Sequence, residues 1–441
     1  MRLPLIATLL LALPANPLPA SEFDNEAGEY TLSALPDPLR EARRMDRMQL
    51  SDQQPAGRHV RKGETISIVV NGLQSGAKLA ATVGFRPMWN VAQTEQSQPL
   101  VEGVNRLRAN QSGPLFFRFN TQRGQDSAMP EVLVQVEGGA SLPLYVDGSM
   151  DAQDWEQELA AHGEAPFVQL LGERAIITLP AEVHAREPVV DPAETFAVLD
   201  QMIQWQDELA GFDGRTARDR PTRLRLHYLV DFRVSAQDRE NFYMYATDQF
   251  IGMLDHNTAD LTDPARLSTQ WGIWHETGHT QQQNSWTFDA LSEVNVNLFS
   301  LYVQERFGES SQLEMAEEGD PTVLEQARDY LDQGAPDFTA EVDEDGAGYF
   351  IKLVMFHQLK EAYGWELFQD LHKHFRAHPL AEDASDEERV DAFVLALCEL
   401  SGHDLREFFG RWGLRASAEA DARLDAAEYA PPDEDLSAIF E

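Results

Sequence analysis

The first third of the chain alternates between short hydrophobic and polar runs. The runs richest in β-forming residues are Thr65–Val70, Leu79–Val83, Leu115–Phe119, Val132–Val136 and Leu142–Val146. Turn-forming dipeptides such as Asn71–Gly72 and Gly138–Gly139 separate them. Several short strands at this spacing indicate an antiparallel β-sandwich, to which we assign residues 55–148.

The middle of the chain, residues 149–310, mixes strand and helix patterns. Arg174–Leu179 and Arg223–Val230 are predicted strands, and Asp191–Pro192 opens a helix that closes at Gly211. Tyr243–Phe250 is expected to reach the cleft of this domain as an edge strand or loop.

Helical patterns dominate the rest of the chain, and we assign residues 311–430 to a helical subdomain. The predicted helices are Tyr349–Tyr363, Trp365–His374 and Glu388–Leu400. Residues 431–441 are acidic and are predicted to form a flexible tail. The expected fold class is therefore an α+β multidomain protein, in which an N-terminal antiparallel β-sandwich precedes a catalytic domain and a C-terminal helical subdomain.

Two helices of the middle domain carry the candidate chemistry. Thr262–Pro264 is a start signal, with a capping side chain followed by proline, and Leu267, Trp271 and Trp274 then recur as a buried stripe. The polar run Gln281–Asn284 ends this pattern. The second helix is predicted from Asp289 to Phe307, with Gly308 as its stop.

The first helix contains the sequence H-E-x-x-H, from His275 to His279. Residues four apart lie on one helical face, so His275 and His279 can bind one metal ion, while Glu276 can reach a water beside it. Gly278, inside the motif, offers room for another backbone or a substrate to approach. This is the arrangement of ligands and general base in a zinc peptidase.

A catalytic zinc site needs a third protein ligand, which the second helix can supply. Glu293 is the preferred candidate, because its hydrophobic neighbours predict a buried helix, and Glu305 is the fallback. Asn297, one turn after Glu293, could accept a hydrogen bond from a liganding His and fix its tautomer.

Hydrolysis by this site also needs groups that contact the substrate. Glu276 is the predicted general base that takes a proton from the attacking water. The candidate donors to the oxyanion are Tyr349, His357 and Tyr302, which the sequence does not rank. The candidate substrate contacts are Trp271, Trp274, Tyr243 and Tyr245.

The motif region resembles a known family. The run from Trp271 to His279, followed by Gln282, Trp286–Thr287 and Glu293–Leu298, is similar to the enhancin and enhancin-like zinc metallopeptidases, family sixty of the metallopeptidases and gluzincins by their third ligand. The similarity extends over roughly residues 55 to 415. It implies a zincin-like catalytic domain, zinc held by His275, His279 and Glu293, and Glu276 as the base.

The resemblance also implies a biological role. Members of the family are secreted or surface-attached, cleave mucin-like O-glycosylated proteins, and combine the peptidase with β-sandwich modules. Many carry long insertions or carbohydrate-binding modules, whereas this chain is compact. Three hypotheses therefore stay open: a secreted zinc endopeptidase acting on O-glycoproteins, a zinc peptidase for unglycosylated substrates, and an inactive glycan-binding protein of the same fold.

Charge and composition narrow the partners. The formal net charge of the 441-residue chain is −39, which argues against nucleic acid or an anionic membrane surface as a partner. No internal stretch approaches the ~20 apolar residues of a membrane span. A protein or glycoprotein substrate is consistent with both observations.

The N-terminus predicts export. Met1–Arg2 precedes an apolar run and the small residues before Ser21, so residues 1–20 resemble a signal peptide that sends the protein to the periplasm or beyond. Residues 21–54 are polar and are expected to be a lead-in linker with a short helix near Asp37–Met48. The lone cysteine, Cys398, excludes a disulfide within the chain and is expected to be buried and inert.

Two further features have alternative interpretations. The predicted sandwich could bind a glycan through Trp89, Phe85 and Arg86, or it could be a structural cap on the catalytic domain, which we favour. The histidines His372, His374 and His378 could form a second metal site, but a solvated helix face is the preferred interpretation.

Overall fold

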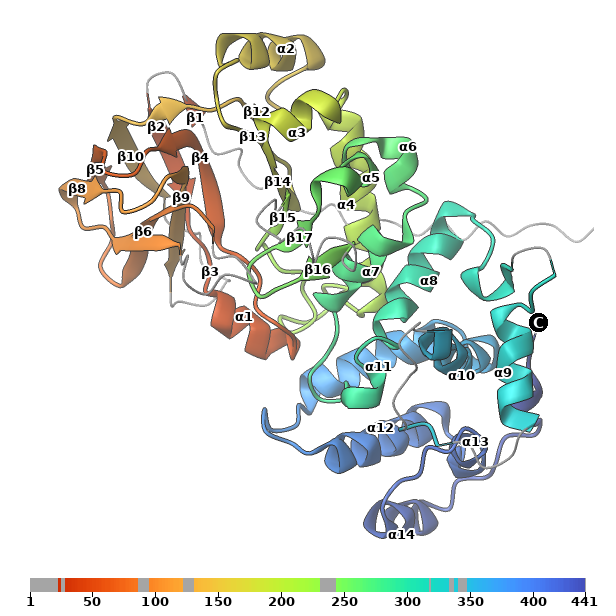
Figure 1. Ribbon diagram of the computed structural model, residues 1–441. Coiled ribbons are helices and arrows are strands. Elements are labelled where there is room, and N and C mark those ends of the chain that lie inside the picture. Colours follow the sequence, from red (N-terminus) through yellow and green to blue (C-terminus); the bar gives the residue numbers. More distant parts are fainter. Residues whose placement is uncertain are drawn as a thin grey trace, which may run out of the picture.

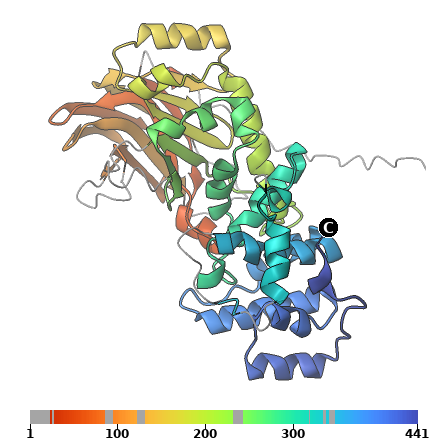
Figure 2. The same ribbon diagram turned by 45° about the vertical axis from the view of Figure 1, so that its right-hand side comes forward.

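The structure is a computed structural model that describes residues 23–24, 28–85, 95–121, 131–230, 243–316, 319–332, 337–339 and 347–440. The predicted signal peptide and the candidate glycan contacts Arg86 and Trp89 lie outside these residues. The predicted mixture of helices and antiparallel sheets is confirmed (Figure 1). In Figures 1 and 2, the N-terminal sheets and the C-terminal helices lie on different sides of a central part that contains both.

Two antiparallel sheets form the N-terminal part. In the first, the order is β1 (Phe23–Asp24), β2 (Glu29–Ser33), β10 (Glu131–Glu137), β5 (Thr65–Asn71) and β8 (Gly103–Arg108). In the second, the order is β11 (Ala140–Ser141), β4 (Gln53–Val60), β9 (Gly113–Thr121), β6 (Ala77–Val83) and β7 (Gln96–Pro99), with β3 (Leu35–Pro36) parallel to β9.

Alternation of apolar and polar residues explains how these sheets pack. In β10, for example, Val132, Val134 and Val136 are buried while the residues between them are exposed. One hydrophobic core joins such side chains of the first sheet to those of the second, among them Phe117 and Phe119 of β9.

Two predicted boundaries of this part are wrong. Strand β2 pairs with β10, so part of the expected 21–54 linker belongs to the first sheet. Polar residues alternate with the buried residues of β2, and the segment was therefore predicted to be a polar linker. The helix expected in that segment is confirmed as α1 (Pro38–Met45). The predicted strand 142–146 appears as β12 (Leu144–Val146), which pairs with β13 of the next sheet.

The central sheet is mixed, and its order is β12, β13 (Phe167–Leu171), β14 (Ala175–Pro180), β15 (Leu226–Val230), β17 (Ile251–Met253) and β16 (Met244–Ala246). Strand β16 forms its edge, as predicted for an edge segment within 243–250. The helices of this part are α2 (Ala152–Ala161), α3 (Ala181–Arg186), α4 (Pro192–Leu209), α5 (Ala259–Thr262), α6 (Pro264–Leu267) and α7 (Trp271–His279).

The predicted helix that starts at Asp263 is divided into α6 and α7. The carboxylate of Asp263 accepts a hydrogen bond from the Ala265 N–H and starts α6 as expected. The hydroxyls of Ser268 and Thr269 then donate to the carbonyls three residues earlier, at 2.9 and 3.0 Å. Such local bonds compete with helix continuation, so α7 begins separately at Trp271.

The second predicted helix is also shorter than expected. A short 3₁₀ turn covers Asp289–Leu291, and α8 begins only at Val296 and ends at Phe307. Gly308 ends α8 in the left-handed conformation, as predicted. Glu293 therefore lies in the turn before α8 and not within a helix.

After Gly308 the regular elements are helical. They are α9 (Val323–Asp332), α10 (Ala347–Tyr363), α11 (Glu366–Ala377), α12 (Asp386–Ser401), α13 (Arg406–Arg411) and α14 (Ala418–Ala427). They share one hydrophobic core with α8. The predicted flexible tail is wrong for the described residues up to 440, because Leu436 is buried and Gln358 donates to the carbonyls of Ser437 and Ile439, both at 3.1 Å.

Within the described ranges, no helix is both long enough and apolar enough to cross a membrane.

Candidate metal centre

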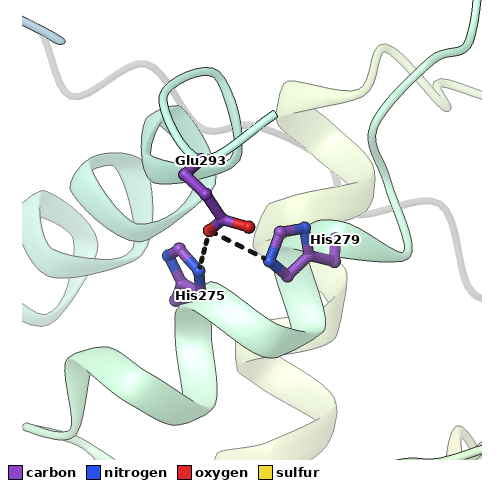
Figure 3. Close-up of side chains that lie close together, drawn as sticks. All are labelled: His275, His279 and Glu293. Carbon is purple, nitrogen blue, oxygen red and sulfur yellow. Dashed lines mark hydrogen bonds and ion pairs between the residues drawn. The ribbon is translucent and has the colours of Figure 1, made fainter. Parts of the chain in front are cut away.

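The candidate centre lies where α7 meets the start of α8. His275 and His279 lie four residues apart on α7, and Glu293 reaches them from the turn before α8 (Figure 3). A Cβ atom on Gly278 would lie 3.1 Å from the backbone oxygen and a side-chain methyl of Val296. Glycine in the motif therefore lets the two segments approach closely, as the sequence suggested.

The three side chains converge through one carboxylate oxygen. Oε2 of Glu293 lies 3.1 Å from Nε2 of His275 and 3.5 Å from Nε2 of His279. In the part of the chain that the structure describes, these three residues form the one cluster of His, Cys, Asp or Glu whose ligand atoms all lie within 4.8 Å of one another. Glu305 does not join them, because its carboxylate pairs with Lys360 at 3.3 Å.

Amide oxygens behind the imidazoles determine their tautomers. Nδ1 of His275 lies 2.7 Å from Oδ1 of Asn297, and Nδ1 of His279 lies 2.6 Å from Oε1 of Gln282. An amide oxygen only accepts, so each Nδ1 carries a hydrogen, and in the neutral form of each ring the lone pair of Nε2 faces Glu293.

This tautomer makes the cluster a good fit for a metal ion. In this form, two imidazole lone pairs face one carboxylate oxygen at 3.1 and 3.5 Å. Three acceptors at such distances repel one another unless a cation lies among them. Neutral imidazole and carboxylate are ligands that zinc prefers, and three of them leave a fourth position for water or substrate.

The residues that orient the imidazoles are themselves held by further hydrogen bonds. Asn297 accepts from the indole N–H of Trp271 at 3.1 Å and donates to the Glu293 carbonyl at 2.8 Å. Gln282 donates to the Ser292 carbonyl at 2.7 Å. Gln282 was not predicted as a partner of His279, although its position three residues later on the chain could have suggested it.

Glu276 lies beside the cluster in a largely enclosed position. Burial, and to a smaller extent the charge of Glu293, raise the pKa of its carboxyl. The charges of His279 and His275 and a hydrogen bond from the Ala246 N–H lower this pKa. The net shift is upward. Ala246 is the last residue of edge strand β16. The edge strand therefore helps to position the predicted base.

Charges within the cluster act on Glu293 and His279 in opposite directions. When both rings are protonated and no metal ion lies between them, hydrogen bonds from Nε2 of His275 and His279 hold the pKa of the Glu293 carboxyl well below its usual range. Burial lowers the pKa of His279, but its hydrogen bond to Glu293 and the charge of Glu276 outweigh burial and raise it. The cluster thus stabilises positive charge between its members.

The candidate oxyanion donors lie in different surroundings. Tyr302 accepts a hydrogen bond from Arg306, and its ring packs 5.1 Å from that of Trp365, toward the far end of α8. His357 lines a cavity with Glu305 and Trp365, and none of the three candidate ligands lines that cavity. Tyr349 adjoins Phe350, whose ring lies 5.7 Å from that of Trp271. The role of Tyr349 as an oxyanion donor stays a prediction.

Two of the four predicted substrate contacts are core residues. Trp274 is 1% exposed and donates to the Leu267 carbonyl at 3.0 Å. Tyr245 is buried against Gly252 and Phe250. The structure thus contradicts these two assignments, because both rings are buried in the protein interior.

The other two predicted contacts lie closer to the surface. Tyr243 is 38% exposed, donates its hydroxyl to Asp260, and packs its ring where a side chain on Gly272 would collide with it. Trp271 is half-buried and fixes Asn297.

The remaining sequence candidates are structural. His372 is fully buried between Trp286 and Phe299, and burial lowers its pKa to about 3, which contradicts the predicted solvated face at this position. Phe85 packs against Phe167 and His227 of the central sheet and is therefore an interface residue rather than a glycan contact.

The buried position of Cys398 agrees with its predicted inertness. Burial raises the pKa of its thiol to about 11, so little thiolate is present near neutral pH.

The sequence pattern of the peptidase M60, enhancin and enhancin-like, family matches residues 138–413. The chain therefore belongs to this family, as the resemblance of the motif region predicted.

Curated relatives are longer proteins of varied description. The chain is 24% identical over 368 residues to TRPM8 channel-associated factor 3 of Mus musculus, covering 81% of this chain and 37% of the relative. It is 23% identical over 342 residues to the putative lipoprotein AcfD homolog of Escherichia coli K12, covering 67% of this chain and 21% of the relative. The chain thus spans about a third or less of the length of these relatives.

Solved structures share the fold over almost the whole chain. A functionally unknown conserved protein from Bacillus anthracis str. Ames, solved as a mutant, has a TM-score of 0.79 at 28% identity, covering 93% of this chain and 80% of that one. The M60 catalytic domain of ZmpC from Clostridium perfringens, solved in complex with the sialyl T antigen, has a TM-score of 0.71 at 18% identity, covering 93% and 81%. The structure thus has the fold of an M60 metallopeptidase catalytic domain.

Proposed function

We propose that the protein is an exported zinc-dependent endopeptidase that hydrolyses peptide bonds in O-glycosylated, mucin-like proteins. The observation that carries this proposal is the cluster of His275, His279 and Glu293, whose acceptor atoms face one another beside the half-buried Glu276. The glycoprotein substrate is supported by the sialyl T antigen in the related ZmpC domain. Export is supported by the N-terminal pattern and by the lipoprotein relative.

In this proposal His275, His279 and Glu293 hold the zinc ion. When bound, zinc supplies a Lewis acid that polarises a scissile carbonyl and acidifies water. Asn297 and Gln282 keep both imidazoles in the tautomer that can bind it. Their hydrogen bonds also fix ring orientation, so the ligand positions are set before substrate arrives.

Glu276 performs the proton transfer. Its carboxylate accepts a proton from the attacking water and returns one to the leaving amine. The raised pKa suits this exchange, because a carboxyl whose charged form is disfavoured by burial holds the proton more firmly. The Ala246 N–H keeps the carboxylate aimed along the edge strand.

The N-terminal sheets are proposed to be a structural cap on a zincin-like catalytic domain, followed by the helical subdomain. A hydrogen bond of 3.0 Å joins Gln53 of β4 to His227 of β15, and Phe85 packs between the two parts. These contacts support a fixed position for the sheets.

A binding protein without activity is the second candidate. The observation that favours it is the similarity to a channel-associated factor, whose name describes association and not hydrolysis. The complete set of three ligands and a base in this chain weighs against it.

Hydrolysis of a matched substrate pair tests the proposal. The substrates are an O-glycosylated mucin-type peptide and the same peptide without glycan, and the enzymes are the wild type, Glu276→Gln and the control Glu305→Gln. We expect cleavage of the glycopeptide only, a loss of about 10²–10⁴-fold in Glu276→Gln, loss with a chelator, and no loss in Glu305→Gln.

Each other outcome has a clear meaning. Equal cleavage of both peptides would overturn the glycan requirement but keep the peptidase. Absence of cleavage by a zinc-loaded wild type, with glycopeptide binding retained in Glu276→Gln, would favour the binding protein.

A further inference from the structure

A second cavity lies beside the end of α7, and the mechanism does not use it. Its volume is about 310 Å³, and it is lined by the segment after α1, the two residues before β14, the last turns of α4, residues 220–224 with Leu226, and the two residues that follow His279. Glu173 is exposed and residues 220–223 are half-buried, so the cavity opens to solvent on that side. We call it the arginine cavity, after Arg47, Arg174, Arg220 and Arg223.

The charge of the arginine cavity is opposite to that of the protein. The whole chain has 35 basic and 74 acidic residues. The described lining instead contains four arginines and two carboxylates, those of Glu173 and Asp207. The cavity is therefore a local positive region on a strongly negative molecule.

Asp207 cannot neutralise these arginines alone. One of its oxygens lies 2.6 Å from Nη1 of Arg174, and the other accepts from Nε2 of Gln281 at 3.0 Å. Both oxygens are thus engaged, and Arg174 takes the ion pair. Arg47 has neutral partners only: its Nη1 donates to the amide oxygen of Gln281, and its guanidinium lies 5.4 Å from the centroid of the Phe212 ring.

Arg47 carries the clearest sign of a missing partner. Its side chain lines the cavity, the residue is only 3% exposed, and its Nε donor has no hydrogen-bond partner. Burial lowers its pKa to about 10; the charges of Asp207 and Glu41 oppose this, and those of Arg44 and Arg376 add to it. A buried guanidinium with an unused donor is costly unless an acceptor of opposite charge reaches it.

Arg223 adds a second cation at the rim. Burial lowers the pKa of its guanidinium, and its charge in turn lowers that of neighbouring Arg225. A planar guanidinium offers paired N–H donors that match the oxygens of a phosphate, sulfate or carboxylate group.

We propose that the arginine cavity binds a small oxyanion, a phosphate, sulfate or carboxylate group carried by a molecule no larger than about a monosaccharide. The volume lies at the lower end of small-molecule pockets, which start at about 300 Å³. Arg47 holds the anion from the closed side and Arg223 from the open side. The inference does not depend on peptidase activity, since none of the three metal ligands lines the cavity.

Isothermal titration calorimetry on the full chain tests this site. The probes are inorganic phosphate, sulfate, acetate and glucose 6-phosphate at constant ionic strength. Comparison of phosphate and sulfate with acetate distinguishes tetrahedral oxyanions from carboxylates. Comparison of phosphate with glucose 6-phosphate distinguishes a free ion from a phosphate group on a larger molecule. The variants are Arg223→Gln, Arg223→Lys and the control Arg423→Gln, an exposed arginine on α14. His275→Ala serves to exclude an anion bound at zinc.

We expect saturable binding of at least one probe by the wild type and by His275→Ala. Arg223→Gln should weaken it by about 10–100-fold, the range expected for a lost charge-assisted hydrogen bond. The affinity of Arg223→Lys for the probe should lie between those of the wild type and Arg223→Gln. Arg423→Gln should change the affinity by less than about twofold. Circular dichroism tests whether each variant is folded. If Arg223→Gln is unfolded, the comparison of Arg223→Lys with the wild type tests the proposal.

Three results would overturn the proposal. The first is absence of binding of all four probes to the folded wild type at 10 mM. The second is equal binding by the wild type and both Arg223 variants. Loss of binding in His275→Ala alone would assign the anion to the metal cluster instead and would also overturn it.

Discussion

His275 and His279 on α7 and His374 and His378 at the end of α11 are pairs with the same spacing, yet only one pair belongs to a cluster of ligands. The rings of the first pair lie 4.7 Å apart and those of the second 5.0 Å apart. Proximity of two imidazoles is therefore common to both.

What differs is what surrounds each pair. Glu293 approaches His275 and His279 from another segment, and amide oxygens of Asn297 and Gln282 fix their tautomers. Nδ1 of His378 instead lies 3.2 Å from the backbone carbonyl of His374, within the same helix end. Helical spacing places two imidazoles together, but a third ligand and fixed tautomers require tertiary structure.

The largest effect is expected from removing the third ligand. Glu293→Ala should weaken zinc binding by about 10²–10³-fold, since one ligand supplies roughly a quarter of a binding free energy of about 10–16 kcal/mol. Competition with a chromophoric chelator measures this affinity. The control Glu305→Gln should bind zinc like the wild type; an equal loss in both variants would contradict the assignment of Glu293.

A smaller effect is expected from the residues behind the imidazoles. Asn297→Ala and Gln282→Ala should each weaken zinc binding by about 10–100-fold, because the liganding ring loses its fixed tautomer. Asn297→Asp, which keeps the acceptor, should recover most of the affinity. If neither alanine variant changes zinc affinity while both stay folded, the two amides have no positioning role.

His372, close to the second pair, should affect stability rather than metal binding. Its folded pKa of about 3 lies below the ordinary value of 6.5, so the unfolded chain takes up a proton first. The contribution of His372 to the free energy of unfolding is therefore fully present above pH 6.5 and is lost as the pH falls. Between pH 7.5 and pH 5 the loss is about 2 kcal/mol.

Urea unfolding at these two pH values measures the effect. His372→Leu should lose about 2 kcal/mol less than the wild type on acidification, and the control His378→Leu should behave like the wild type. The same pH dependence in all three proteins would show that His372 is not a buried neutral imidazole.

The smallest effect is expected at the second pair itself. His374→Ala and His378→Ala should change zinc affinity by less than about twofold, because neither residue joins the cluster of ligands. Zinc content per chain, measured by mass spectrometry of the purified protein, should also stay at about one ion. A fall in content would reveal a second site.

Patterns that are local in sequence predicted much of the fold. Strand β5, helix α4 with its Asp191 cap, and the Gly308 stop of α8 follow from alternation, capping and turn chemistry within a few residues. The break between α6 and α7 also has a local cause. The hydroxyls of Ser268 and Thr269 bond to nearby carbonyls and end α6, although the hydrophobic stripe predicted one continuous helix.

Features that depend on distant residues were not predictable in the same way. Strand β2 is defined by its pairing with β10, and the C-terminal segment is held by Gln358, about 80 residues earlier in the chain. In the site, sequence spacing placed His275, His279, Glu293 and Asn297 together. It gave no signal for Ala246, whose N–H reaches Glu276 from the edge strand.

The central claim is that His275, His279 and Glu293 bind one zinc ion. Crystals of the zinc-loaded protein, with diffraction measured on both sides of the zinc absorption edge, test it most directly. The account predicts one strong anomalous peak at about 2.0–2.2 Å from Nε2 of His275, Nε2 of His279 and a carboxylate oxygen of Glu293. A zinc-loaded crystal with no peak there, or with its strongest peak near His374 and His378, would contradict it.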